Sequence, residues 1–260
     1  MRSLLSLFQS SDQNESGVLG YTYASVSQPA QFANATPGLT VGTFTDKPPW
    51  IVVDLSLSSI VVASWPGKLW QVQVLRRATE QPRVGAGYVR ATAVRIEHEL
   101  PSASLFGANG LAIEEVFRHA LHLTIENGIR LTERSNRAAS EVFSAAWNRW
   151  LAEVEPTNPH RNQDHRDTLA VFAAGQRSPV GPAFTVLHSI TTKRARELEG
   201  DAAFVVDEEE QAFAPAWASA FSALLHACMA LGASSTVLSD DERAVLLAGY
   251  SGIQASSSAQ

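Results

Sequence analysis

Several features that would point to a known chemistry are missing from this sequence. Cysteine occurs once in 260 residues, at Cys228. A single cysteine excludes an intrachain disulfide, so packing alone must hold the fold together, and this composition suits a reducing compartment. The first residues, MRSLLSLFQSSD, lack the long apolar centre and the small-residue cleavage pattern of a secretion signal. We therefore expect a cytoplasmic protein.

Positive charge is also in short supply. The chain has 20 Lys and Arg against 26 Asp and Glu, a net charge of -6, and a pI near 5.6. Nucleic-acid-binding proteins usually present a basic face to the phosphates, so this composition argues against a nucleic-acid partner. The acidity is uneven, because residues 1–110 hold 8 basic and 7 acidic side chains, which leaves a net charge of -7 for the rest.

One stretch of the sequence approaches the length of a membrane-spanning helix. The nearest candidate, residues 48–67, has a single charge, Asp54, but contains four serines and is bracketed by prolines. Valine, isoleucine and serine in this mixture are typical of strands rather than of a bilayer-spanning helix. We therefore expect no membrane partner.

The sequence contains none of the short motifs that carry a known mechanism. It has no glycine-rich phosphate loop, no Cys-x-x-Cys pair, no Gly-x-Ser-x-Gly, no His-Glu-x-x-His and no repeat of fixed period. We therefore expect no cofactor. Catalytic triads are defined by geometry rather than by spacing, so an enzyme is disfavoured but not excluded.

The residues that are present change in character near 101–109. Val, Ile and Thr in alternating runs precede this point, and Ala, Leu, Glu and Arg at helical spacing follow it. The pattern predicts an α+β fold, in which an N-terminal, mostly antiparallel β-sheet half is followed by a C-terminal α-helical half packed against it. We expect a flexible segment over 1–16, the β-rich half over 17–100, the helical half over 101–253 in one globular unit with it, and a disordered tail over 254–260.

Alternation and turn residues define the expected strands. Strands are predicted over 18–27, 39–45, 53–58, 60–64, 69–75 and 88–97, with a bulge or break at Ser58-Ser59 where the apolar face changes. Pro66-Gly67 predicts a tight hairpin turn between 60–64 and 69–75, with a positive φ at Gly67.

Helical periodicity and capping residues define the second half. We expect helices over about 111–127, ending at Asn127-Gly128, and over 131–154, 184–198 and 215–231, with a short strand over 202–206. The 215–231 helix is the most apolar and should be central. Ser239 with Glu242 forms a capping-box pattern for a final helix that ends near Gly249. His188, between apolar residues, is expected to be a packed side chain.

Three groups of residues invite a functional interpretation. Asp54 within an apolar strand could act as an acid or base, but its polar neighbours favour a carboxylate on the wet face of the sheet. Glu115, His119, His122 and Glu126 share a helix face and resemble half of a metal site. Because the next helix offers no histidine, we favour a solvated face and expect no metal.

Trp147 and Trp150 lie one helical turn apart and form the third group. Aromatic residues at this spacing can stack on a ligand or meet a partner, since they are enriched at interfaces. Large aromatic side chains are also the usual filling of a core. We favour the core, and we expect Trp147→Ala or Trp217→Ala to unfold the protein.

The most polar loop, residues 155–167, is the one candidate for catalysis. His160, His165 and Asp167 could form a hydrolytic or metal-assisted centre, with a histidine as base and the aspartate orienting it. The loop has two prolines and no apolar anchor, which favours a solvated linker between helices.

Two functions of different classes follow from this sequence. The first is a non-catalytic cytosolic binding or accessory protein that acts through protein–protein contact and presents a sheet edge or an apolar helix face to another protein. The second is a small hydrolase or transferase that uses polar residues of the 155–167 loop. The absence of catalytic motifs beside a fully foldable α+β sequence favours the first.

Overall fold

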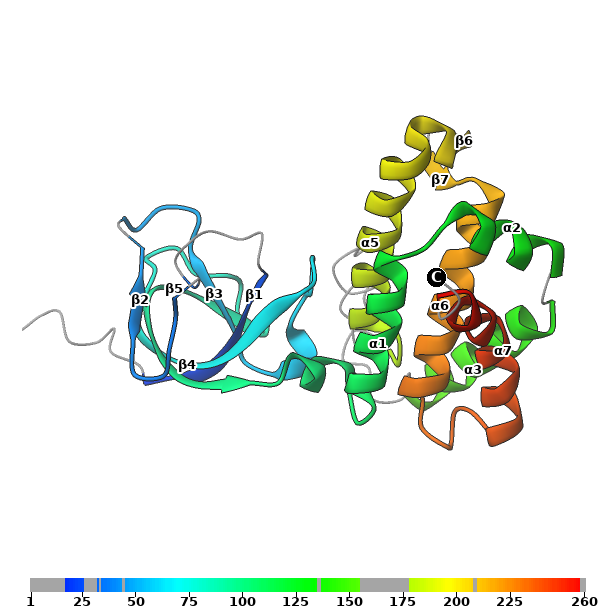
Figure 1. The fold of residues 1–260 in the computed structure, drawn as a ribbon. Helices are drawn as coiled ribbons and strands as arrows, with labels where there is room; N and C mark the ends of the chain where they lie inside the picture. Colours follow the sequence, from blue (N-terminus) through cyan, green and yellow to red (C-terminus); the bar gives the residue numbers. More distant parts are fainter. Residues whose placement is uncertain are drawn as a thin grey trace, which may run out of the picture. The chain divides into compact units, whose positions relative to one another are not determined.

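The computed structural model of the chain describes residues 17–25, 32, 34–43, 45–134, 137–154, 178–207 and 210–257. Strands come first and helices follow, so the predicted α+β class is confirmed (Figure 1). The chain forms two compact units. We call residues up to Ile60 with Pro66–Ser102 the barrel unit, and Val61–Trp65 with the chain from Ala103 onward the helical unit. Whether the two halves pack into one globular unit stays a prediction.

The barrel unit is a closed antiparallel sheet. Four strands form a ring in the order β1–β3–β5–β4 and back to β1, and each pairs with two others of the ring. The fifth strand, β2, pairs with β5 alone. The five strands are β1 (Leu19–Ser25), β2 (Thr40–Gly42), β3 (Ile51–Asp54), β4 (Gly67–Arg77) and β5 (Tyr88–Leu100). Closing a sheet in this way removes the free edges of the ring strands.

Alternating β-branched residues fill the inside of this ring. Val72 and Val74 of β4 and Val94 and Ile96 of β5 are buried around Trp70, while Gln71, Gln73 and Arg95 between them are not. The period of two is what a strand with one buried face requires, and the sequence predicted both long strands correctly.

The region between β3 and β4 differs from the prediction. The strand ends at Asp54, and a single 3₁₀ turn at Leu57–Ser59 follows it, in which the Ser59 hydroxyl donates to the Ser56 carbonyl at 2.8 Å. The predicted strand over 53–58 therefore stops four residues early, and the predicted bulge or break between two strands at Ser58-Ser59 is not found; serine hydroxyls satisfy backbone groups there in place of a strand ladder. Residues 60–64 likewise form no strand.

The predicted hairpin around Pro66-Gly67 is wrong. Gly67 begins β4 and pairs with Ser25 of β1, and its φ is not positive. A Cβ atom there would lie 2.7 Å from the Ala24 carbonyl oxygen and would overlap the Cζ atom and hydroxyl oxygen of Tyr23. Gly67 is therefore a site of close strand approach rather than a turn residue.

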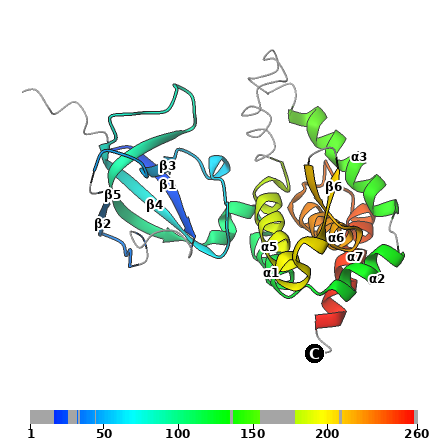
Figure 2. The ribbon, with the colours of Figure 1, turned by 90° about the horizontal axis from the view of Figure 1, so that it is seen from above.

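The helical unit is built around one apolar helix, α6 (Pro215–Gly232), as the sequence predicts. It contacts each of the other described helices of the unit, and Figure 2 shows it surrounded by them. Trp217, Leu224 and Cys228 on it are fully buried. The surrounding helices are α1 (Gly110–Leu121), α2 (Ile125–Arg134), α3 (Arg137–Val154), α5 (Gly181–Glu199) and α7 (Asp240–Ser257). Among the described residues, α6 alone is long and apolar enough for a membrane span, a test that buried core helices also pass.

Two helix ends differ from the predicted ones. The first helix stops at Leu121, and Asn127 belongs to the start of α2, where its side-chain oxygen accepts from the backbone N–H of Thr124 at 2.9 Å. Gly128 lies inside α2 rather than ending a helix. The predicted 131–154 helix is accordingly two helices, α2 and α3.

The final helix begins as predicted. The Ser239 backbone N–H donates to Glu242 Oε2 at 2.9 Å and the Glu242 N–H donates to Ser239 Oγ at 3.4 Å, which is the reciprocal pattern of a capping box. The helix passes Gly249 and continues to Ser257, so the predicted end is wrong. The short strand predicted over 202–206 is β6 (Phe204–Asp207), which pairs with β7 (Glu210–Phe213).

Candidate binding groove

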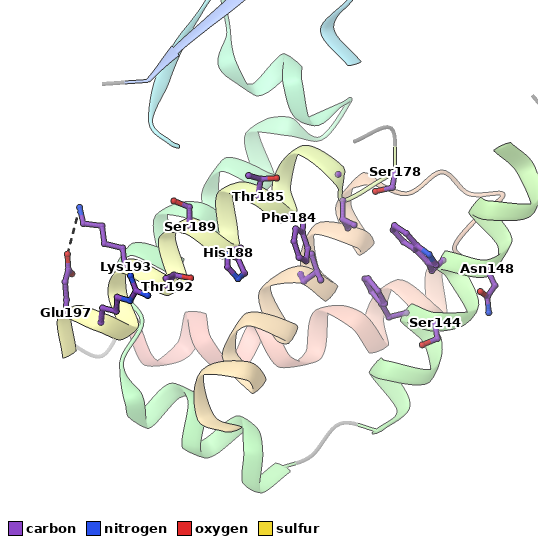
Figure 3. Close-up of a pocket in the computed structure, with 16 residues that line it drawn as sticks. Ser144, Asn148, Ser178, Phe184, Thr185, His188, Ser189, Thr192, Lys193 and Glu197 are labelled. Carbon is purple, nitrogen blue, oxygen red and sulfur yellow. Dashed lines mark ion pairs between the residues drawn. The ribbon is translucent and has the colours of Figure 1, made fainter. Parts of the chain in front are cut away.

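A groove of about 1320 Å³ lies on the helical unit, with walls from α3 and α5 and Leu225 of α6 at its base (Figure 3). Its apolar lining consists of Phe143, Trp147, Val180, Phe184 and Leu225. Small polar side chains line the rest, among them Ser144, Asn148, Thr185, Ser189 and Thr192. We call this feature the α3–α5 groove.

Helical periodicity explains why α5 can line a groove and still belong to the core. Phe184, His188 and Thr192 recur every four residues and therefore share one face, which borders the groove. Val186 and Leu187 on the other side are fully buried, and α5 packs there against α1 and α6. The helix is thus apolar on its core face and mixed on its groove face.

Aromatic rings are concentrated along the α5 wall. The ring of Phe184 meets that of Phe221 edge-on with centroids 5.6 Å apart, and His188 lies 5.3 Å from Phe213 and 5.9 Å from Phe221. Phe184 is 45% exposed, although large aromatic residues are usually buried. His188 is exposed as well, so the expectation that it is packed between core residues is wrong.

Trp147 and Trp150 of α3 lie in different environments. Trp150 is buried, with 6% of its surface exposed, and is a core residue as expected. Trp147 is half-buried, stacks with Phe143 at 6.4 Å and lines the groove. One tryptophan therefore fills the core, and the other supplies an apolar surface.

His226 of α6 packs against Phe143 of the α3 wall. Its ring lies 5.1 Å from that of Phe143. Burial lowers the pKa of His226 to about 4, because the charged imidazolium would lose its hydration. The histidine is therefore neutral near pH 7 and places no positive charge beside Phe143.

The far end of the α5 wall is charged. Lys193 forms an ion pair with Glu197 at 4.0 Å, drawn as a dashed line in Figure 3. Arg196 donates to Gln211 Oε1 at 3.0 Å, and its guanidinium lies 5.2 Å from the centre of the Phe204 ring. One end of the groove is thus aromatic. The other end holds two positive side chains, Lys193 and Arg196, and one negative side chain, Glu197.

Asp54 of the barrel unit is, among the described residues, the one carboxylate whose pKa is strongly raised. Burial raises its pKa to about 7, against a hydrogen bond from Ser59 that acts in the opposite direction. Asp54 alternates with the buried Val53 and shares the strand face of the exposed Val52, as the expected wet-face position requires, but it is half-buried rather than exposed. A general acid or base also needs a substrate cavity, and Asp54 does not line the α3–α5 groove.

His119 of α1 has structural partners. His119 Nδ1 lies 2.8 Å from the Tyr250 hydroxyl and 2.9 Å from the Glu115 carbonyl oxygen, so this ring belongs to the α1–α7 contact. Within the described ranges, no three His, Cys, Asp or Glu side chains converge as metal ligands. That the protein binds no metal stays a prediction.

The remaining candidates give no usable site. His160, His165 and Asp167 lie outside the described residues, so the catalytic interpretation of the 155–167 loop stays untested. Cys228 is fully buried, and burial raises the pKa of its thiol, which removes it as a nucleophile.

Sequence reasoning missed the α5 wall. The signal was present in Phe184, His188 and Thr192, which form a second, half-apolar face on a helix whose other face is fully apolar. Comparison with protein-family models, with curated proteins and with solved structures gives no match for this chain. Function must therefore be inferred from the groove itself.

Proposed function

We propose that this protein is a non-catalytic binding protein that holds an apolar segment of another protein in the α3–α5 groove. The observation that carries the proposal is a large groove whose walls contain the exposed Phe184 and the half-buried Phe143 and Trp147. At about 1320 Å³ it exceeds the roughly 300–1000 Å³ that is usual for small-molecule sites. Exposed apolar surface of this kind marks an interaction site.

The shape of the lining favours a helix as the occupant. Lining residues of α5 run from Gly181 to Glu197, which is about 24 Å at a rise of about 1.5 Å per residue. A partner helix of four to five turns matches that length. Amphipathic helices bind to apolar grooves through anchors at helical spacing, and Phe184 with Trp147 offers rings against which such anchors can pack.

The other surface that the sequence predicted, a sheet edge, has weaker support. Four of the barrel strands form a closed ring, and β2, which pairs with β5 only, is three residues long. Strand addition needs a row of unpaired backbone groups, which a strand of this length offers only to a small extent. The groove is therefore the better candidate of the two.

We also propose that the protein acts in the cytoplasm. Its one cysteine is buried and forms no disulfide, so the fold gains nothing from an oxidising compartment. The alternative function, a hydrolase or transferase that uses the 155–167 loop, stays a prediction. Its candidate residues lie outside the part of the chain that the structure describes.

Site-specific photo-crosslinking in the native host tests the proposed function. The photoreactive amino acid p-benzoylphenylalanine would replace Phe184 in the groove and, as a control, Leu111 on α1, which is 72% exposed. The adduct peptides are then identified by mass spectrometry. We expect position 184, but not position 111, to capture one apolar, helix-forming segment of another protein.

Two results would contradict the proposal. An adduct between position 184 and residues 155–177 of the same chain would mean that the chain itself covers the groove. Equal capture at both positions, or no protein adduct at position 184, would mean that the groove is not a selective protein site. Thermal unfolding of both variants shows whether either replacement has disturbed the fold.

A further inference from the structure

The two ends of the α3–α5 groove differ in chemistry, and this difference restricts the partner. Phe184 and Trp147 form the aromatic end, and Lys193 and Arg196, which also line the groove, form the charged end of the α5 wall. We infer that the partner segment is an acidic amphipathic helix, with its carboxylates nine to twelve residues from its apolar anchors. This inference rests on the proposed function and specifies the chemistry of the partner.

The positive charges of the groove are available to a ligand. The Lys193 side chain is 81% exposed and its pair with Glu197, at 4.0 Å, is an exposed ion pair of the kind that contributes little. Arg196 contacts the neutral side chain of Gln211 and a ring face, and no described carboxylate forms an ion pair with it. A partner carboxylate would therefore gain charge-assisted hydrogen bonds here without first breaking a strong one.

The surroundings make these charges selective. Residues 111–260 carry a net charge of -7, so a basic spot in this half differs in sign from most of the surface around it. Complementary charge speeds association and fixes the orientation of a bound segment, whereas like charge elsewhere disfavours other placements. An acidic helix is therefore directed to the Lys193–Arg196 end.

The spacing follows from the helical rise. Phe184 is nine residues from Lys193 and twelve from Arg196 on α5, or about 14 and 18 Å along the axis. A partner helix that lies along α5 advances at the same rate. Its carboxylates should then lie within the same nine to twelve positions of its large apolar anchors, and a spacing of about eleven returns them to the helix face that carries the anchors.

A peptide-display selection on the full chain tests this inference. The probe is a phage-displayed library of 18-residue helix-forming peptides, randomised at all positions and selected on the wild-type protein. We expect enriched peptides to carry a pair of large apolar residues with Asp or Glu nine to twelve positions away. Their affinity should fall at least about tenfold on the Lys193→Glu, Arg196→Glu variant.

A charge-matched control variant distinguishes an effect of the groove charges from an effect of the protein's net charge. Arg130→Glu with Arg137→Glu changes the net charge equally at exposed positions outside the groove lining, and it should leave the affinity within about twofold. A loss of the same size in both variants would overturn the inference. Melting curves of all variants establish that each is folded.

The remaining outcomes separate the inference from the proposed function. Enriched peptides that lose binding on Phe184→Ser but lack the spaced carboxylates would overturn the acidic-helix inference and leave the groove as a protein site. Peptides that bind Phe184→Ser as tightly as wild type, or a selection without enrichment, would overturn the proposed function as well.

Discussion

Gly128 of α2 lies directly against the backbone of Ala216 in α6. A Cβ atom at residue 128 would stand 2.7 Å from the Ala216 carbonyl carbon and still closer to the carbonyl oxygen. Two helix backbones can approach this closely only where one of them has no side chain. This contact seats α2 on the central helix, which also contributes Leu225 to the base of the α3–α5 groove.

Gly128→Ala should therefore destabilise the protein, although alanine is the better helix former by about 1 kcal/mol. We expect a loss of about 2 kcal/mol or more, because α2 must move away from α6. Gly249→Ala in α7 is the matched control: its nearest neighbour would be the Ala223 Cβ at 3.2 Å, so a smaller change is expected. Urea unfolding measures both, and a Gly128→Ala protein as stable as wild type would contradict the described contact.

Gly67→Ala tests the corrected role of Gly67. The new Cβ would meet the Tyr23 ring and the Ala24 carbonyl oxygen, so we expect a loss of about 2 kcal/mol. Lys68→Ala, at an exposed ion pair, should cost less than about 1 kcal/mol. In a Tyr23→Ala background part of the clash is removed and the cost of Gly67→Ala should fall. An unchanged cost in that background would instead favour turn strain as the cause.

These glycines show which parts of the fold the sequence could reveal. The capping box of Ser239 with Glu242 and the apolar stripe of Trp217 and Leu224 depend on residues that are close in sequence, and both were predicted correctly. Gly67 and Gly128 looked like turn and stop signals, because the strand and the helix that approach them come from distant parts of the chain.

The α3–α5 groove was invisible in the sequence for the same reason. Trp147 and Phe184 belong to different helices, and only the tertiary arrangement brings them to one groove. Each residue alone is compatible with a core position, as was expected for Trp147. The one local indication was the half-apolar face of α5 that carries Phe184, His188 and Thr192. This face predicts an exposed surface, but it does not show which helix forms the opposite wall of the groove.

Asp54 makes the stability of the fold depend on pH. Its folded-state pKa of about 7 exceeds the ordinary 3.8, so the folded protein binds this proton more tightly than the unfolded chain does. The stabilisation is complete below about pH 4 and is lost as the pH rises through 7. Between pH 5 and 8 we expect a loss of about 1 to 2 kcal/mol from this group, after allowance for its partial exposure.

Asp54→Asn removes the titration and should flatten this part of the profile. The measurement is urea unfolding of both proteins at pH 5 and at pH 8. The advantage of Asp54→Asn over wild type should grow with pH, because asparagine carries no charge to desolvate. Parallel profiles for the two proteins would show that Asp54 titrates as an ordinary carboxyl group.

His119 connects α1 to α7 through the Tyr250 hydroxyl at 2.8 Å. On the solvated face that the sequence favoured, replacing His119 would leave stability unchanged; the structure instead indicates a cost of about 1 kcal/mol for His119→Ala. Tyr250→Phe, which removes only the hydroxyl group, should show most of the same loss. His122→Ala, at an exposed position, is the control, and equal melting temperatures for all four proteins would exclude a stabilising contact.

The central claim is that the α3–α5 groove holds a segment of another protein. Its most direct test is calorimetric titration of the partner segment, synthesised as a peptide, into wild type, Phe184→Ser and Leu111→Ser. Phe184 lines the groove and Leu111 is an exposed apolar residue outside it. Our account predicts binding at least about tenfold weaker for Phe184→Ser and within about twofold of wild type for Leu111→Ser. Equal affinity for all three proteins would contradict it.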